Sequence, residues 1–386
     1  MNAMTEIPED DQLLLDSVEK WLERDVRPHV LRLEHADEWP EEMVAQMAEM
    51  GLFGATIPTE YGGLGLSATT YARIVEKIAE TWMSLTGIFN SHLIMAACVT
   101  RMGTEEQKRH WLPKFAAGEL RGGLALTEPD CGTDLQAIRT RAAKQGNGYV
   151  VNGTKTWISN GIHGQCFALL VKTDPEAEPR HKGMSMFIAE KGEGFTVSKK
   201  LEKLGYKGID SAELVFEDYQ IGAENLLGGV EGKGMQAALG GLELGRINIA
   251  ARGCGLASAA LKDSVRYAQE RRTFGKPIGQ HQAIQLKLGE MATKVQAARL
   301  LTYDAARAYD TGERCDMEAG MAKYFASEAA VDNSLEAMRI HGGYGYSKEY
   351  HVERYFRDAP LMCIGEGTNE IQRMIIAKQI MERNPA

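Results

Sequence analysis

The sequence lacks several features that mark other protein classes. Its 6 cysteines are scattered without a CxxC pair, so we expect free thiols in a reducing compartment rather than disulfides. No apolar run approaches the ~18 residues that a membrane-spanning helix needs. The acidic first residues contain no apolar stretch, so we expect neither a secretory signal nor a transit peptide, and we expect a cytoplasmic protein.

Basic charge is also scarce. The chain has 44 Lys and Arg against 53 Asp and Glu, which leaves a formal net charge of −9. A nucleic-acid-binding protein normally shows a basic face, so this balance argues against a nucleic-acid partner. It is compatible with a basic pocket for one acidic ligand.

Several well-known catalytic motifs are missing. The 9 histidines show no HExxH spacing, and we predict no metal. The absence of a GxSxG motif disfavours a hydrolase triad. The glycine-rich stretches 62–65 and 342–345 do not lie between the strand and helix of a βαβ unit, and 228–234 lacks the P-loop spacing.

The 386 residues, 44% of them hydrophobic, are enough for two or three globular domains. Apolar residues recur at helical spacing up to about residue 118, short β-branched runs separated by turns follow, and long helical segments begin near residue 234. We therefore predict an α+β protein of three domains. These are an N-terminal helical domain over 1–120, a small β-barrel or sandwich over 121–232 and a helical bundle over 233–386.

A glycine-flanked glutamate near the end of the chain is the most informative feature. Residues 364–372 read IGEGTNEIQ, and Glu366 stands between two glycines that add no side chain. A hydroxyl, an amide and a second acid follow, and an apolar pattern typical of a helix then begins. Hydrogen-bonding groups at the positive end of a helix suit a phosphate or a polar cofactor. The alternative is a glycine-rich turn that caps the last helix.

Two segments of the β region carry groups that suit a planar ring system. Leu124–Asp134 reads LALTEPDCGTD, so a strand ends in hydroxyls and a tight turn. Trp157–Gly161 reads WISNG, and in a regular strand Trp157 and Ser159 face the same side. An indole and a hydroxyl on one face can stack on a ring and hydrogen-bond to it. The alternative is an ordinary core tryptophan.

A third segment suits a diphosphate. Arg271 and Arg272 are followed by Thr273, and His281-Gln282 comes shortly after. Two guanidiniums beside a hydroxyl can bind phosphate oxygens. The alternative is a solvated basic end of a helix.

Together these segments resemble the acyl-CoA dehydrogenase family, and the resemblance covers nearly the whole chain. Each piece is moderately specific, whereas the set in this order and spacing is highly specific. The pieces are PTEYGGLG from Pro58, LALTEPDCGTD from Leu124, WISNG from Trp157, ERRTFGKPI from Glu270, RIHGGYGYSKEY from Arg339 and RDAPLMCIGEGTNEIQ from Arg357.

The resemblance implies FAD, bound between the β domain and a C-terminal four-helix bundle. On the β side it implies contacts from Leu124, Leu126, Thr127, Gly132, Thr133, Trp157, Ile158 and Ser159, with Ser159 near N5. Residues that reach FAD across a dimer interface would be Arg271, Phe274, His281, Gln282, Arg339, Gly342 and Gly343, and the C-terminal loop would add Thr368 and Glu370. The acyl-CoA would be bordered by Thr133, Leu242, Glu243, Arg246 and Gly367.

The resemblance also implies a reaction and partners. Glu366 would take the Cα proton of an acyl-CoA while flavin N5 takes the Cβ hydride, which yields the trans-2-enoyl-CoA. The backbone N–H of Glu366 and a ribitol hydroxyl would polarise the thioester oxygen. A base in an apolar pocket is expected to have a raised pKa. The family is usually a homotetramer, a dimer of dimers, that passes electrons to an electron-transferring flavoprotein.

The chain departs from the common family pattern at four positions. Gly365 stands where a bulky residue is usual, and the others are Asp130, Thr133 and Arg339. Some relatives carry the base on the helix that holds Arg246, at the position of Gly245 here, so Glu366 is the matched candidate and Glu243 is disfavoured. Alternatives within the fold are an acyl-CoA oxidase or a flavin monooxygenase, and the non-enzyme alternative is a flavin or acyl-CoA binding subunit.

Two observations bear on the acyl group. The segment 81–91, which borders the acyl tail in relatives, contains no Arg or Lys, so a terminal carboxylate would be unpaired there. We therefore expect an uncharged acyl chain and disfavour glutaryl-like substrates. Gly365 leaves space beside Cα and Cβ, where a branch or ring could sit.

Overall fold

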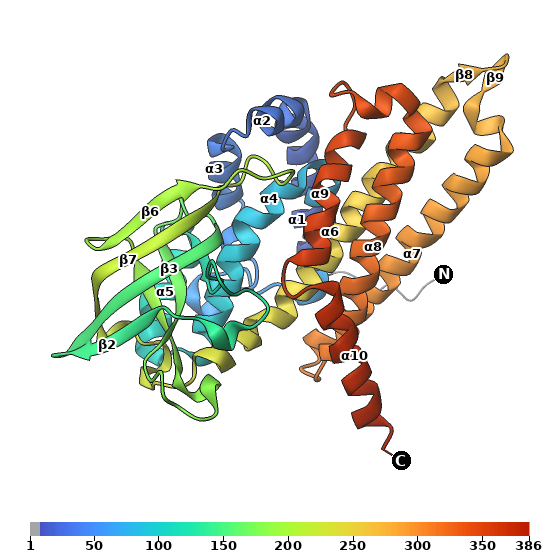
Figure 1. The fold of residues 1–386 in the computed structure, drawn as a ribbon. Coiled ribbons are helices and arrows are strands. Elements are labelled where there is room, and N and C mark those ends of the chain that lie inside the picture. Colours follow the sequence, from blue (N-terminus) through green and yellow to red (C-terminus); the bar gives the residue numbers. More distant parts are fainter. Residues whose placement is uncertain (1–7, 386) are drawn as a thin grey trace.

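The computed structural model describes residues 8–385, and its order of elements is helical, β, helical (Figure 1). The N-terminal helices are α1 (Glu9–Trp21), α2 (Val30–Ala36), α3 (Glu41–Glu49), α4 (Ala68–Met102) and α5 (Glu105–Ala116). The C-terminal helices are α6 (Gly234–Glu270), α7 (Gln282–Asp310), α8 (Asp316–His341), α9 (Val352–Ile364) and α10 (Asn369–Arg383). The predicted α+β class with a C-terminal bundle is confirmed.

Helix α4 is the central helix of the N-terminal part. Its first turn is capped by the Ser67 side chain, which accepts a hydrogen bond from the Thr70 backbone N–H. The helix is kinked at Trp82, where φ is −153° and ψ is 104°. By length and composition α4 could span a membrane, but 83% of its most apolar 18-residue window is buried inside the protein. That burial is what a core helix shows.

The central domain is a 7-stranded curled sheet with the order β1-β4-β2-β3-β7-β6, in which β5 pairs with β4. Its strands are β1 (Gly122–Ala125), β2 (Arg141–Gln145), β3 (Gly148–Ser159), β4 (Cys166–Lys172), β5 (Met184–Glu190), β6 (Phe195–Lys200) and β7 (Ser211–Gly222). The pairs of β4 with β1 and with β2 are parallel, and the remaining pairs are antiparallel. The curl encloses an aromatic core that includes Phe167, Phe187 and Phe216.

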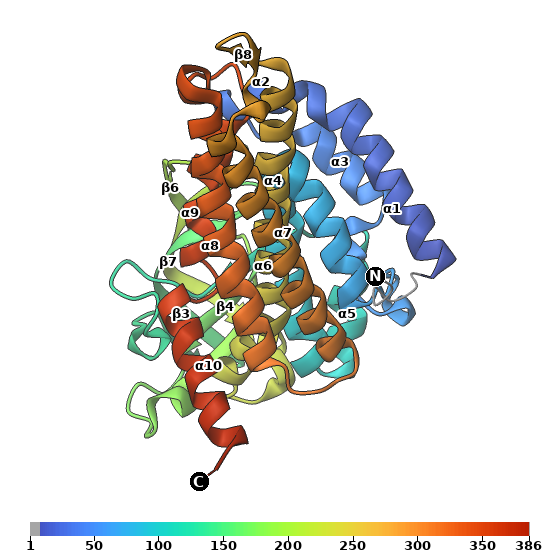
Figure 2. The ribbon, with the colours of Figure 1, turned by 90° about the vertical axis from the view of Figure 1, so that its right-hand side faces the viewer.

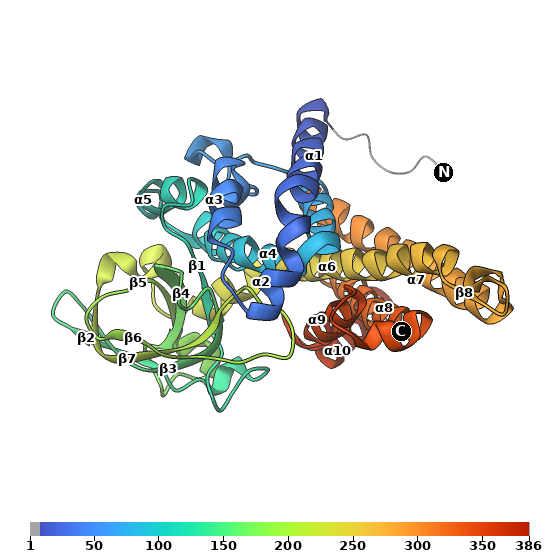
Figure 3. The same cartoon turned by 90° about the horizontal axis from the view of Figure 1, so that it is seen from above.

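Helix α4 lies between the sheet and the C-terminal bundle (Figure 3). Helix α6 comes close to its neighbours because it carries glycines at the contacts. A Cβ on Gly253 would lie 2.6 Å from the Ala326 carbonyl oxygen in α8, and one on Gly255 would lie 2.5 Å from the Glu76 carbonyl oxygen in α4. Helices α6, α7, α8 and α9 run side by side (Figure 2). A short hairpin, β8 (Arg272–Thr273) and β9 (Lys276–Pro277), projects at their tip.

Candidate active site

The loop between α9 and α10 holds Glu366 in an unusual backbone conformation. Its φ is 56°, and that of Gly367 is 84°. A non-glycine residue in the left-handed region carries a conformational cost that surrounding contacts must offset. Here Gln372 supplies such contacts, because its buried amide nitrogen donates to the carbonyl oxygens of Glu366 at 3.2 Å and Gly367 at 3.1 Å.

A second hydrogen-bond network, which includes Lys323 of α8, fixes the start of α10. Thr368 is the N-cap, and its hydroxyl accepts from the Ile371 N–H. Asn369 is buried and accepts a hydrogen bond from Lys323 Nζ at 2.8 Å. Lys323 Nζ also donates to the Cys363 carbonyl at 3.2 Å, and burial lowers the pKa of this amine to about 8. The residues on both sides of Glu366 are therefore held by α8 and α10.

The Glu366 carboxylate points at a gap in helix α6. A Cβ built on Gly245 would lie 2.9 Å from Glu366 Oε2 and 3.1 Å from the Cδ1 of Ile94. Because Gly245 has no side chain, the Glu366 carboxylate has room beside α6 at this position. Burial raises the pKa of Glu366, and three cations oppose that shift: Arg252, Arg246 and Lys323.

Space is left beside the base on the other side as well. A Cβ built on Gly365 would meet only the Leu361 carbonyl oxygen within 4 Å, at 3.5 Å. That is an ordinary contact distance, so neighbouring atoms do not fill the position where a side chain would begin.

On the β domain, a buried ion pair fixes the turn after β1. Lys155 Nζ lies 2.7 Å from Glu128 Oε1 and donates to the Leu126 carbonyl at 2.9 Å. Glu128 also accepts from the backbone N–H groups of Arg139 and Thr140. Neither charged residue was singled out from the sequence, because a lone acid and a lone lysine in separate strands carry no local signal.

Strand β3 is irregular just before Ser159, although exposed Trp157, buried Ile158 and half-buried Ser159 still alternate along it. The register of β3 against β7 shifts between Lys155 and Ile158, and Trp157 has a φ of 60°. This bulge turns the indole outward, where it is 58% exposed, while Ile158 is buried. The alternative of an ordinary core tryptophan is therefore wrong, and Trp157 offers an open aromatic face.

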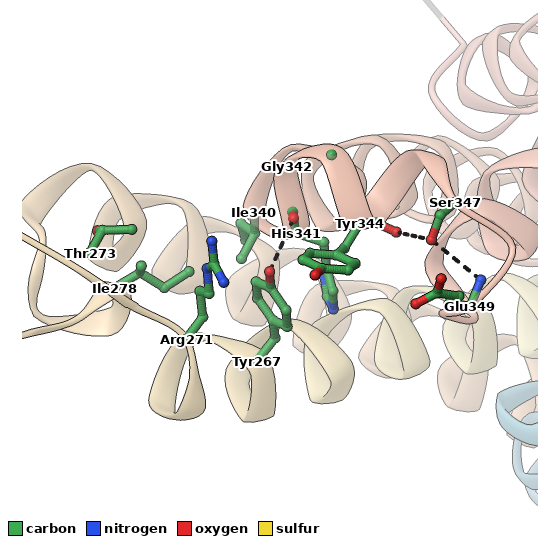
Figure 4. A pocket seen from close by; sticks show the side chains of 11 residues that line it. Tyr267, Arg271, Thr273, Ile278, Ile340, His341, Gly342, Tyr344, Ser347 and Glu349 are labelled. Carbon is green, nitrogen blue, oxygen red and sulfur yellow. Dashed lines mark hydrogen bonds between the residues drawn. The ribbon is translucent and has the colours of Figure 1, made fainter.

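A cavity of about 590 Å³ lies at the tip of the bundle (Figure 4). It is lined by Arg271, Thr273, His341, Gly342, Gly343 and Tyr344, among others. The Arg271 guanidinium lies 5.9 Å from the centroid of the Tyr344 ring, and no described carboxylate forms an ion pair with it. Gly342 has a φ of 62°, and a Cβ on either glycine would meet nothing within 4 Å. An unpaired arginine beside bare backbone suits an anionic group such as a diphosphate.

Other predicted cofactor residues are spread around this tip. Phe274 is 96% exposed, and the Thr273 hydroxyl lies 3.1 Å from His281 Nε2, next to Gln282 at the start of α7. Arg339 is paired with Glu336 and does not line the cavity. Within one chain, the β8–β9 hairpin at this tip and the β domain, whose strand β3 contains Trp157, lie on opposite sides of the molecule (Figure 1). One chain therefore does not bring the two predicted halves of the cofactor site together.

The predicted substrate residues have varied surroundings. Arg246 is buried and its Nε has no hydrogen-bond partner among the described residues. Glu243 lies 3.8 Å from Arg101, and burial together with a hydrogen bond to Asp316 raises its pKa to about 7. Thr133 is exposed, Leu242 is half-buried, and Gly367 stands directly after the base. Glu243 is thus engaged away from Glu366, which weakens it as an alternative base.

Models of one protein family match all three parts of the chain. The family model described as acyl-CoA dehydrogenase, N-terminal domain, matches residues 8–119. The middle-domain model of the same family matches 123–219, and its C-terminal-domain model matches 232–381.

Individual relatives span the whole chain. An acyl-CoA dehydrogenase of Bacillus subtilis is 40% identical over 97% of this chain and 99% of its own length. An acryloyl-CoA reductase (NADH) of Anaerotignum propionicum is also 40% identical, over 97% of this chain and 95% of its own.

Solved structures have the same fold. Butyryl-CoA dehydrogenase from Megasphaera elsdenii superposes with a TM-score of 0.94 at 35% identity, and covers 97% of this chain and 99% of its own. A glutaryl-CoA dehydrogenase from Mycobacterium smegmatis in complex with FADH2 has a TM-score of 0.90 at 26% identity, and covers 97% of this chain and 95% of its own.

Proposed function

This chain belongs to the acyl-CoA dehydrogenase family, and we propose that it removes two hydrogens from Cα and Cβ of an acyl-CoA to form the trans-2-enoyl-CoA. The family resemblance found in the sequence is confirmed, and the chain is an oxidoreductase with FAD as its cofactor. FAD, when bound, supplies the acceptor for the Cβ hydride.

We propose that FAD is held by the two halves of the site described above. The exposed Trp157 indole fits an aromatic ring system, and the Thr127 carbonyl accepts a hydrogen bond from the neighbouring Thr156 N–H at 2.9 Å. We propose Leu124, Leu126, Thr127, Gly132, Ile158 and Ser159 as further contacts of the cofactor. The unpaired Arg271 beside Gly342 and Gly343 fits the diphosphate. Because one chain keeps these halves apart, the tip of a second copy is proposed to complete each site.

Glu366 is proposed as the base that takes the Cα proton. The observation that carries this proposal is the Glu366 carboxylate in the space left by Gly245, on a loop held by Gln372. Burial raises the pKa of the carboxyl towards the range where a general base works well, while the charges of Arg252, Arg246 and Lys323 oppose that shift. The backbone N–H of Glu366 is proposed to donate to the thioester oxygen, which acidifies the Cα proton.

The finer points of the reaction are also proposals. Some relatives are named as reductases, such as the Anaerotignum propionicum protein, so the net direction is not given by the family. We propose dehydrogenation as the net direction, with an electron-transferring flavoprotein as acceptor, although the same base would serve the reverse reaction by returning the Cα proton. The open space at Gly365 favours a branched or cyclic acyl group. We also propose that the protein is cytoplasmic.

Exposed apolar residues support the proposed homotetramer. Large apolar side chains are exposed on the hairpin, on α7 and on α10: Phe274, Leu286, Leu300, Met374, Ile380 and Met381. A contact between proteins would remove these side chains from water, which is favourable. A dimer of dimers would cover such faces.

Anaerobic bleaching of the flavin tests the proposal. Purified protein should be yellow and should lose that colour when a suitable acyl-CoA is added from a panel of straight, branched, cyclic and dicarboxylic thioesters, with the enoyl-CoA as product. Slow reoxidation of the reduced, product-bound enzyme in air would exclude the oxidase and monooxygenase alternatives. A colourless protein, or a flavin that no acyl-CoA bleaches, would contradict the proposed function.

A further inference from the structure

Arg252 in α6 is a buried cation without a carboxylate partner. Arg252 is only 3% exposed, and no described carboxylate forms an ion pair with it. Nη1 donates to the Tyr206 hydroxyl at 3.1 Å and Nη2 to the Thr86 carbonyl at 3.3 Å, while Nε has no hydrogen-bond partner within residues 8–385. Buried charges in proteins are normally paired, so this arrangement is unusual for a purely structural arginine.

The position of Arg252 on the helix connects it to the base. Gly245, which marks the place of the Glu366 carboxylate, stands seven residues earlier, and this is about two helical turns or ~10 Å on the same face. Asn248 lies between them and donates to the Tyr71 hydroxyl at 2.8 Å, while its Oδ1 has no hydrogen-bond partner in the described part of the chain. The face that leads away from Glu366 is therefore polar and ends in a cation.

The surroundings of Arg252 are built from three segments of the chain. A Cβ on Gly87 in α4 would lie 1.5 Å from the Tyr206 hydroxyl oxygen, so the glycine is what admits this hydroxyl. Tyr206 itself has a φ of 57°, and its backbone N–H donates to buried Asp358 at 2.6 Å. The tyrosine is thus fixed before β7, the glycine lies just after the kink of α4, and both meet Arg252 from α6.

The charges of Arg252 and Glu366 affect the same two buried tyrosines, Tyr206 and Tyr71. Beyond the effect of burial, which raises the pKa of Tyr206 and Tyr71, the charge of Arg252 lowers both values and the charge of Glu366 raises them. A simpler role for Arg252 is therefore to keep Glu366 ionised. That role gives Nε no partner among the described residues. It also does not explain why Tyr206 contacts Arg252 or why a glycine at 87 makes room for the Tyr206 hydroxyl.

We propose that Arg252 binds a carboxylate at the far end of the acyl chain, so that the substrate is the monothioester of a short dicarboxylic acid. This inference rests on the proposed function and names its substrate class. It replaces the expectation of an uncharged acyl chain. That expectation considered only 81–91, whereas the structure brings Arg252 from α6 to Thr86 within that segment.

The test compares two substrates of the same shape that differ in terminal charge. Glutaryl-CoA and its terminal amide are given to the FAD-loaded wild type and to Arg252→Gln, and kcat/KM is taken from anaerobic flavin reduction. The wild type should prefer the carboxylate, and Arg252→Gln should lower that preference at least about tenfold, mainly through KM. Arg252→Lys, which keeps the charge, should restore part of it. Lys262→Gln, an exposed position on the same helix, should keep the wild-type preference.

Each other outcome has a distinct meaning. If the wild type reacts with neutral acyl-CoAs and prefers the amide, or if Arg252→Gln changes both substrates equally, the carboxylate site is wrong and the proposed function stands. An equal change that comes with a shifted acidic limb of the pH profile would assign Arg252 to the electrostatics of Glu366. If no acyl-CoA of any kind bleaches the flavin, both the function and this inference are overturned.

Discussion

Glu366 has a left-handed backbone conformation that few non-glycine residues adopt. Its carboxylate also fits only because residue 245 has no side chain. The left-handed φ of 56° directs the carboxylate to α6, and Gly245 leaves room for it there. Either feature alone would fail to place the base, because a side chain at 245 would occupy the same space. The two features stand more than 100 residues apart in the sequence, so they act together only in the folded chain.

The raised pKa of Glu366 predicts an acidic limb in the pH profile. The base acts only when ionised, so the rate of flavin reduction should rise with pH through a pKa above the ordinary glutamate value of 4.5. The same shift affects folding. The folded state keeps a proton that the unfolded chain releases, so the contribution of this group to the free energy of unfolding is largest below 4.5 and falls as pH rises through the folded pKa.

Two measurements check this prediction. Stopped-flow flavin reduction as a function of pH should show the limb. Chemical denaturation should show Glu366→Gln to be at least as stable as the wild type at neutral pH, since the variant has no charge to bury. A rate that does not fall until pH drops to 4.5 would contradict the raised pKa.

Gly245→Ala should disturb the base directly. The new Cβ would lie 2.9 Å from Glu366 Oε2, which is closer than such atoms approach, so the carboxylate must move. Small displacements of a catalytic group commonly cost one to two orders of magnitude, and we expect flavin reduction to slow about tenfold to hundredfold while FAD is retained. Gly289→Ala, where a Cβ meets nothing within 4 Å, is the control. Equal rates in the two variants would contradict the geometry.

At the scale of elements, the active-site loop depends on the first turns of α10. Thr368 is the N-cap of this helix. Buried Asn369 accepts a hydrogen bond from Lys323 of α8, and buried Gln372 donates to the Glu366 carbonyl. The loop is short and its carbonyl groups are partly buried, so they require partners inside the protein. Helix α10 therefore both ends the fold and positions the base.

Gln372→Ala should loosen this loop. It removes the hydrogen bonds to the Glu366 and Gly367 carbonyls, and leaving buried acceptors unsatisfied costs about 1–3 kcal/mol. We expect kcat to fall more than KM rises, because the base is displaced while the acyl-CoA contacts remain. Steady-state kinetics checks this, with the exposed neighbour Arg373→Gln as control. Wild-type kcat in Gln372→Ala would show that the loop holds its conformation unaided.

Elements with an apolar pattern could be predicted from the sequence, and those without one could not. The apolar runs Phe167–Val171 and Met184–Ile188 predict the buried strands β4 and β5, whereas no such run marks β2 and β6, which are mostly exposed and polar. The sequence pattern predicts helical segments over 67–80 and 85–102, and the kink of α4 at Trp82 lies between them. The bulge at Trp157 was missed because strand alternation assumes a regular backbone.

Site residues divide in a similar way. Glu366 and Arg271 stand in local motifs and could be singled out. Gln372, Lys155 and Arg252 could not, because each acts through partners distant in the chain or through burial that only the fold creates. The contacts of the predicted cofactor residues with FAD stay predictions.

At the scale of the whole molecule, the cofactor site is divided between distant surfaces. Trp157 belongs to β3 of the β domain and Arg271 stands between α6 and β8, and Figure 1 shows the β domain and the β8–β9 hairpin on opposite sides of the molecule. Phe274, 96% exposed in one chain, stands beside that tip. Assembly and cofactor binding should therefore be linked, since each stabilises the state that favours the other.

Arg271→Ala should weaken both properties together. Loss of a hydrogen bond to a charged group costs about 1.5–3 kcal/mol, so FAD should dissociate more readily and the assembly should become less stable. FAD release on dilution and sedimentation velocity measure the two effects, with exposed Arg266→Ala on the same helix as control. A stable monomer that holds FAD as tightly as the wild type would show that the site is complete in one chain.

The most direct test of the central claim is anaerobic flavin reduction by Glu366→Gln, with Glu382→Gln on α10 as the matched control. Both proteins should bind FAD and acyl-CoA. We predict that Glu366→Gln loses roughly three or more orders of magnitude in the rate of bleaching, because it lacks the group that takes the Cα proton, while Glu382→Gln keeps the wild-type rate. Bleaching by Glu366→Gln at a near-normal rate would contradict the assignment of the base, and Glu243 would be the next residue to test.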